Sequence, residues 1–177
     1  MKCVAWMLMA MVVGCVLGSP AWGQDVNGVD ASRLAVSALG NDQTVCLRAG
    51  WRAGDRTEIG IEGLWADGVG DDTSEALGAS VYATYDLMSV QTTKILSVEI
   101  PTTVYAGVKA GALFPTEGAD QDVDATAALL TGVTFGSDRV RLGMEAQLYA
   151  PNEWLGWQEF AELDDSARLL VTAQIRF

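Results

Sequence analysis

The chain ends on Ala167-Arg-Leu-Leu-Val-Thr-Ala-Gln-Ile-Arg-Phe177, a stretch in which apolar residues fall on every second position. One parity is entirely apolar and finishes on the aromatic Phe177, whereas the other carries Arg168, Thr172, Gln174 and Arg176. A period of two residues is typical of a β-strand whose two faces meet different surroundings. The stretch therefore predicts a strand with one apolar and one mostly polar face that runs to the last residue.

The same alternation recurs over residues 44–52, 58–65, 79–87, 103–114, 125–135 and 140–149. Residues 125–135 are a weaker case, because they are rich in Ala and Leu on both faces. Leu34, Val36 and Ala38 indicate one further strand at the start, which brings the number to eight. An even number of strands of roughly 9–11 residues is what a barrel that crosses a membrane needs. We therefore predict an all-β fold, an eight-stranded antiparallel up-and-down transmembrane β-barrel.

The connections between these strands alternate in length. Residues 53–56 and 136–139 are tight turns, whereas residues 66–75, 115–124 and 150–164 form long, acidic connections. Short periplasmic turns and longer outer loops are typical of outer-membrane barrels. Two segments fit this pattern badly. The outer connection at residues 40–43 is short, and residues 89–100 are long for a periplasmic turn. Because alternation continues there up to Pro101, residues 94–100 are either a strand extension or an extra edge piece.

The N-terminus indicates export. Lys2 precedes an apolar run from Val4 to Leu17, and Ala21-Trp22-Gly23 supplies the small residues of a cleavage site. We expect residues 1–23 to be a cleaved signal peptide and residues 24–177 to form a single outer-membrane barrel domain. The run is shorter than the roughly 20 residues of a membrane-spanning helix. An alternative is a lipoprotein signal, since the four residues ending at Cys15 loosely match a lipobox.

Composition excludes several classes of function. The expected mature chain has ten basic and 23 acidic residues, a net charge of −13, so no nucleic-acid partner is expected. It keeps a single cysteine, Cys46, and therefore has no internal disulfide. Half of the residues are apolar, yet no run after residue 24 is as long as a transmembrane helix. Insertion into a membrane would therefore require a closed barrel.

The polar face of the predicted strands carries six basic and four acidic residues. We expect these charges to lie inside the barrel and to form a structural network of ion pairs that bridges neighbouring strands, because an eight-stranded barrel is just wide enough for side chains to fill. A water-filled conduit is the alternative, if inward glycines such as Gly50 and Gly60 leave gaps. The predicted network consists of Arg48, Arg52, Glu58, Glu62, Asp86, Lys109, Arg141, Glu145, Arg168 and Arg176.

Catalysis and metal binding have little support in the sequence. The chain contains no histidine, and Glu58, Glu62 and Glu145 are more simply partners of the inward arginines than general acids or bases. We therefore predict no enzyme, no cofactor and no metal site. Asp120-Gln-Asp-Val-Asp124 has the opening spacing of a calcium loop but lacks its later Gly and Glu. We expect the acidic loops either to provide solvation or to bind lipopolysaccharide phosphates through divalent ions. Trp154 and Trp157 predict an aromatic girdle at the outer interface, and a patch for a protein partner is the alternative.

In architecture and in its terminal Phe177 the mature chain resembles the small outer-membrane barrels of the OmpA and OmpX type. The resemblance implies a monomer in the bacterial outer membrane, in contact with lipid and lipopolysaccharide. It also implies folding by the outer-membrane assembly machinery, with Ala173, Ile175 and Phe177 as the C-terminal assembly signal. The implied role is non-enzymatic, structural or surface-interacting. Two alternatives stay open: a narrow pore or small-ligand carrier, and a soluble periplasmic lipocalin-like barrel with its apolar face inside.

Overall fold

The computed structural model describes residues 33–69, 74–95, 98–116, 124–150 and 167–177, and the features below concern these ranges. Within them, no helix is long and apolar enough to cross a membrane. The chain forms eight β-strands, which are β1 (Leu34–Gly40), β2 (Thr44–Arg52), β3 (Thr57–Val69), β4 (Ser74–Ile95), β5 (Val98–Pro115), β6 (Asp124–Gly136), β7 (Val140–Tyr149) and β8 (Ala167–Arg176).

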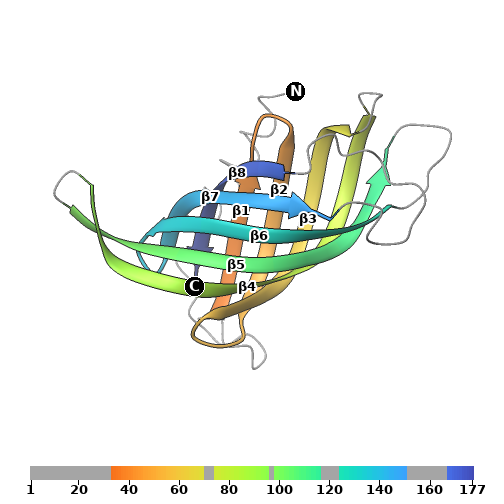
Figure 1. Ribbon diagram of the computed structural model, residues 1–177. Coiled ribbons are helices and arrows are strands. Elements are labelled where there is room, and N and C mark those ends of the chain that lie inside the picture. Colours follow the sequence, from red (N-terminus) through yellow and green to blue (C-terminus); the bar gives the residue numbers. More distant parts are fainter. Residues whose placement is uncertain (1–32, 70–73, 96–97, 117–123, 151–166) are drawn as a thin grey trace.

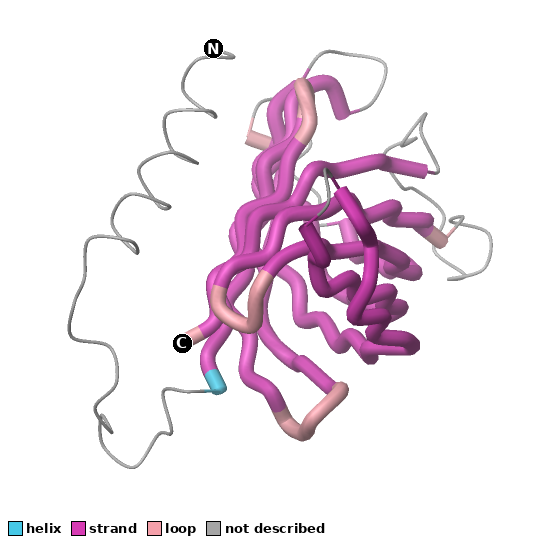
Figure 2. Tube along the Cα trace, turned by 90° about the vertical axis from the view of Figure 1, so that its left-hand side faces the viewer, coloured by secondary structure: helices cyan, strands magenta, loops and turns pink. Residues whose placement is uncertain are grey.

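The eight strands close into one antiparallel barrel (Figures 1 and 2). Each strand pairs with its neighbour in the sequence, and β1 pairs with β8 to close the wall, with Ala38 opposite Ala173. The backbone amide of Phe177 donates to the carbonyl of Leu34 at 3.0 Å and extends this closing seam by one residue. The predicted all-β, eight-stranded, up-and-down barrel is confirmed, including the less evident first strand.

The two faces of the wall differ sharply in chemistry. Outward aliphatic side chains are exposed, with Ile61 at 64% and Val81 at 62%, whereas the inward Glu62 is 2% exposed and Lys109 is 4% exposed. This is the reverse of a lipocalin-like barrel, in which the apolar face would line the interior. The large exposed apolar side chains are Leu47, Ile59, Ile61, Leu77, Val81, Tyr85, Leu87, Met88, Val90, Val108, Phe114, Leu129, Val140, Leu142, Met144, Leu148, Leu169 and Val171.

We call the two ends of the barrel the turn end and the loop end. The turn end holds the tight β2–β3 and β6–β7 connections and Phe177. Gly136 ends β6 there with a φ of 143°, a backbone conformation that residues other than glycine rarely adopt. At the loop end, β1 and β2 are joined by residues 41–43 alone, and the Asn41 side chain accepts hydrogen bonds from the backbone amides of Gln43 and Thr44.

The predicted long connection at residues 66–75 is wrong for most of its length. β3 continues to Val69 and β4 begins at Ser74, with a register shift after the pair Ala66–Ala76. Acidic residues indicate contact with water, but they do not end a ladder of backbone hydrogen bonds, so the hairpin stays paired. Residues 117–123 and 151–166, which include most of the other two predicted loops, lie outside the described residues, as does the predicted signal peptide.

Residues 89–100 belong to a long hairpin rather than to a turn. β4 runs to Ile95 and β5 starts at Val98, so the strand extension is the alternative that the structure contains. The pairing with β3 begins at Tyr85 and that with β6 at Thr102. Apart from the amide of Asp86, which donates to the carbonyl of Arg56, the segment between them pairs only with itself. Its register shifts opposite Pro101, which cannot donate to the ladder. The resulting arm projects past the turn end of the barrel (Figure 1).

Candidate functional site

The interior of the barrel is layered along its axis, and an apolar layer occupies the loop end. Leu39, Cys46 and Leu64 lie side by side on β1, β2 and β3, and Leu170 on β8 packs with them. All four side chains are nearly or fully buried, and Cys46 is a free thiol. The sequence pattern placed these positions on the mostly polar face, so this apolar layer was missed. Its remaining members are Ala66, Ala76 and Leu113.

The middle layer is a network of four buried charges around Arg48. Its guanidinium donates to both oxygens of Glu145, at 2.6 and 2.7 Å, and its Nε donates to Glu62 Oε2 at 2.6 Å. The second cation, Lys109, donates to Glu62 Oε1 at 2.8 Å and to the amide oxygen of Gln147 at 2.7 Å. Two positive and two negative charges from β2, β3, β5 and β7 therefore cancel inside the wall. Such pairing makes the burial of these charges tolerable.

Two tyrosines complete the middle layer by lying over glycines of a neighbouring strand. Tyr105 pairs with Gly132 in the register, and its hydroxyl donates to Glu145 Oε2 at 2.8 Å. A Cβ added to Gly132 would collide with the Tyr105 ring. Tyr82 likewise lies over Gly60 and donates to Glu58 Oε1 at 2.9 Å. The tyrosine rings thus fill the space beside these inward glycines, whereas the conduit alternative required that space to be empty.

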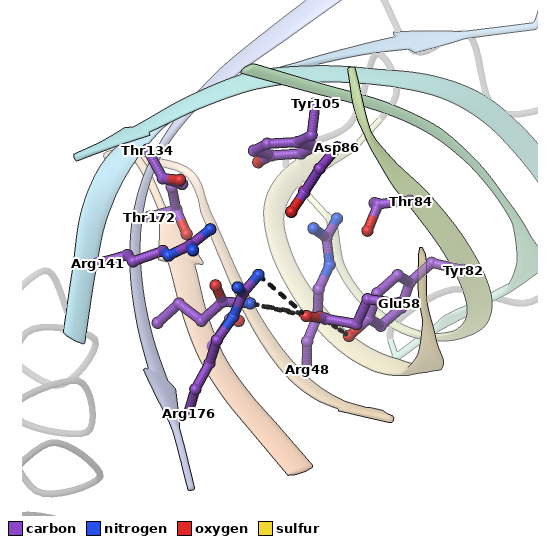
Figure 3. Close-up of a pocket in the computed structure, with 12 residues that line it drawn as sticks. Arg48, Glu58, Tyr82, Thr84, Asp86, Tyr105, Thr134, Arg141, Thr172 and Arg176 are labelled. Carbon is purple, nitrogen blue, oxygen red and sulfur yellow. Dashed lines mark hydrogen bonds and ion pairs between the residues drawn. The ribbon is translucent and has the colours of Figure 1, made fainter. Parts of the chain in front are cut away.

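The third layer is a small polar cavity between the network and the turn end (Figure 3). Its volume is about 30 Å³. Glu58 lies on one side and accepts hydrogen bonds from Tyr82 and from the Gln174 amide, the latter at 3.1 Å. Arg176 Nη2 lies 3.6 Å from Glu58 Oε2. Asp86 and Arg141 also line the cavity, so five of the ten predicted network residues, counting Arg48, border it.

The other predicted network residues lie at the ends of the barrel. Arg52 donates to the backbone carbonyl of Asp55 at 2.7 Å, at the turn end. Arg168 lies at the loop end, donates to Thr44 Oγ1 at 2.9 Å and stacks over the Tyr149 ring. The ten residues therefore form one central quartet, a turn-end group and a separate loop-end arginine, rather than one continuous network.

Several residues that satisfy the charges were not singled out from the sequence. Gln147 donates to Glu145 Oε1 at 2.8 Å and accepts from Lys109 and Tyr149, and Gln174 donates to Glu58. All of them share the polar parity of their strands, so the alternation contained the signal. Only the charged residues of that face were selected from the sequence, so these neutral donors and acceptors were left out.

The predicted C-terminal assembly signal lies on the outward face of β8. Ala173 and Ile175 pair with Ala38 and Val36 of β1, at the seam that closes the barrel. Both side chains are partly exposed, as is that of Phe177. Ala173 and Ile175 are therefore apolar residues beside the seam, and Phe177 follows at its end.

The interior geometry is suited to holding strands together rather than to reacting. Glu62 and Glu145 are each bonded by at least two donors, which leaves neither carboxylate poised to accept a proton from a substrate. Within the described ranges, no group of three or more Cys, Asp or Glu side chains is placed to hold a metal ion.

Comparison with known proteins gives likeness in chain path alone. No protein-family model matches the sequence, and no curated protein matches it. Among solved structures, the chain is similar to the N-terminal β-barrel domain of Pseudomonas aeruginosa OprF, at 11% identity and a TM-score of 0.47 over 80% of this chain and 93% of that one. It is also similar to Neisserial surface protein A, NspA, at 12% identity and a TM-score of 0.47 over 81% and 93% of the two chains.

Proposed function

We propose that this protein is a non-enzymatic outer-membrane barrel that has a structural or surface-interaction role in the bacterial envelope and does not conduct. The observation that carries the proposal is the contrast between its two faces. The described outward positions carry large exposed apolar side chains such as Ile61 and Val81, and the inward positions of the middle layer hold four hydrogen-bonded charges under an apolar layer. A wall that is apolar outside and charged inside is stable where its outer solvent is lipid.

The filled interior favours a plug over a narrow pore. The Arg48–Glu145 pair joins β2 to β7 across the barrel, and Lys109 joins β5 to Glu62 on β3. Ions would have to break these bonds and then pass the side chains of Leu39 and Leu170. In the envelope the outward apolar residues would contact lipid, and lipopolysaccharide would surround the loop end. Export through a cleaved signal peptide, assembly by the outer-membrane machinery and a monomeric state complete the proposal.

The proposal is tested by reconstituting residues 24–177 into lipid vesicles and planar bilayers. We expect a folded species that migrates differently on a gel before and after heating, and no channel steps at any applied voltage. Val81→Arg, on the centre of the outward face, should lower the free energy of unfolding in lipid by about 2–4 kcal/mol. Gln43→Arg, in the exposed β1–β2 turn where only the backbone amide of Gln43 is bonded among the described residues, is the matched control and should change it little. Discrete conductance steps would contradict the plug, and equal effects of the two substitutions would contradict the membrane placement.

A further inference from the structure

The turn-end cavity contains hydrogen-bonding groups that the protein itself leaves unused. The Arg176 side chain is 10% exposed, and its Nε has no hydrogen-bond partner. The hydroxyl of Thr134, a residue that is 6% exposed, also has none. Both residues line the cavity (Figure 3). Buried polar groups are nearly always hydrogen-bonded to protein, water or a ligand, so two unpaired polar atoms in one cavity indicate that the cavity binds something.

The positive charges of the arginines on β7 and β8, beside these unpaired atoms, are incompletely balanced. Arg141 donates to Thr103 Oγ1 at 3.2 Å, and the acidic group that it approaches is the fully exposed Asp138, at 4.0 Å. Arg176 has only the 3.6 Å approach to Glu58, whose oxygens already accept bonds from Tyr82 and Gln174. The two guanidinium groups, on side chains that are 12% and 10% exposed, thus line one cavity with only long approaches to carboxylates, at 4.0 and 3.6 Å.

The strand register places the donors on one wall. Thr134 of β6 and Thr172 of β8 lie on either side of Gly143 in the register, and both line the cavity. Arg141 precedes Gly143 by one inward position on β7, and Arg176 lies on β8 beyond Gln174, the partner of Arg141. Four donors from three adjacent strands therefore surround one volume of about 30 Å³, more than the roughly 10–15 Å³ that a single water needs.

We propose that this cavity is a binding site for a small free oxyanion of the phosphate or sulfate class. Arg141 and Arg176 donate charge-assisted hydrogen bonds to the anion, with Arg176 contributing the unused Nε, and the Thr134 hydroxyl donates a third. Guanidinium groups suit such oxyanions because their planar donors match the spacing of the oxygens. The inference goes beyond the structural role proposed above and does not depend on membrane placement.

Asp86 sets the limit on affinity. Its carboxylate lines the opposite side of the same cavity and, together with that of Glu58, repels an anion, so binding is weak. The same residue provides a gain-of-binding test, because Asp86→Asn removes the repulsion and leaves the donors in place. A phospholipid headgroup shares the phosphate chemistry, but the cavity lies inside the wall, where acyl chains do not follow. A free ion is therefore the source that fits.

The experiment uses the mature chain, residues 24–177, refolded in a maltoside detergent that contains no phosphate. The Nε–H resonances of its arginines are followed by NMR during titration with sodium phosphate, sodium sulfate or sodium chloride at constant ionic strength. We expect saturable shifts of the Arg176 resonance with phosphate and sulfate but not with chloride. Arg141→Gln should weaken the phosphate affinity by about tenfold or more, since bonds to charged groups contribute at least that much.

Three comparisons decide the result. Arg168→Gln, at the loop end, is the matched control and should leave the affinity unchanged, whereas Asp86→Asn should raise it severalfold. Asp86→Asn removes no donor to the anion, so it keeps the test valid even if Arg141→Gln fails to fold. The proposal is overturned if shifts do not saturate, if chloride acts like phosphate, or if Asp86→Asn binds no more tightly. A response to short-chain phosphatidylglycerol without one to inorganic phosphate would also overturn it.

Discussion

The ion pair between Arg48 and Glu145 provides the most informative stability test, because it joins opposite parts of the wall through two bonds of 2.6 and 2.7 Å. Replacing Arg48 by Met leaves Glu145 buried without its cation, and breaking a buried pair in this way costs about 3–5 kcal/mol. Glu145→Gln keeps one acceptor oxygen and loses one charge-assisted bond, at a cost of about 1.5–3 kcal/mol. The double variant has neither unpaired charge, so its loss of stability should be smaller than the sum of the two single losses by about 2 kcal/mol.

The assay is equilibrium unfolding in lipid vesicles, followed through tryptophan fluorescence. Trp51 and Trp65 belong to β2 and β3 and report on the folded wall. Arg168→Met is the control, since Arg168 bonds only neutral groups, Thr44 and the Tyr149 ring, among the contacts that the structure describes. Independent sites add within about 0.5 kcal/mol. Additivity of the Arg48 and Glu145 substitutions to within that value would refute the central network as a cooperative structural unit.

Three further predictions concern other parts of the barrel. Gly132→Ala should lower the free energy of unfolding by about 1–3 kcal/mol, because its Cβ displaces the Tyr105 ring, whereas Gly63→Ala, with open space around it, should change little in the same titration. The thiol of Cys46 in the folded mature chain should resist alkylation, while a thiol introduced by Ser137→Cys in the exposed turn reacts; equal rates would show that water reaches the apolar layer. Replacing residues 91–101 by an Asn-Gly turn should leave folding and heat-modifiable migration intact, since these residues pair only with one another; loss of the folded band would contradict this.

The strands and their two faces were readable from the sequence because a barrel wall keeps two different solvents apart over its whole height. Alternation from Val104 to Phe114 or from Val140 to Leu148 predicts both the strand and the side that faces outward. The ends of strands were less readable. β3 and β4 continue through a stretch rich in Asp and Glu, because a hairpin that rises into water can stay paired while its side chains become charged.

Contacts between side chains across the barrel could not be predicted from the alternation. Arg48 and Glu145 are 97 residues apart, and only the shear of the closed wall brings them together. The layering was hidden for a related reason. Leu39, Cys46, Leu64 and Leu170 have the parity of the charged residues, and alternation does not tell at which height along the axis an inward side chain lies. The cavity depends on the direction of the Arg141 and Arg176 side chains, which no sequence period encodes.

The central claim is a barrel with lipid outside and a filled interior, and spin-label accessibility tests its outer face most directly. Labels are attached at Val81→Cys, Val108→Cys and Ser137→Cys, each in a Cys46→Ala background reconstituted in vesicles. Val81 and Val108 lie on the outward face at 62% and 54% exposure. We predict that their labels collide with oxygen and are shielded from a water-soluble nickel complex, with the reverse at Ser137. Collision of the nickel complex with all three labels alike would contradict the account.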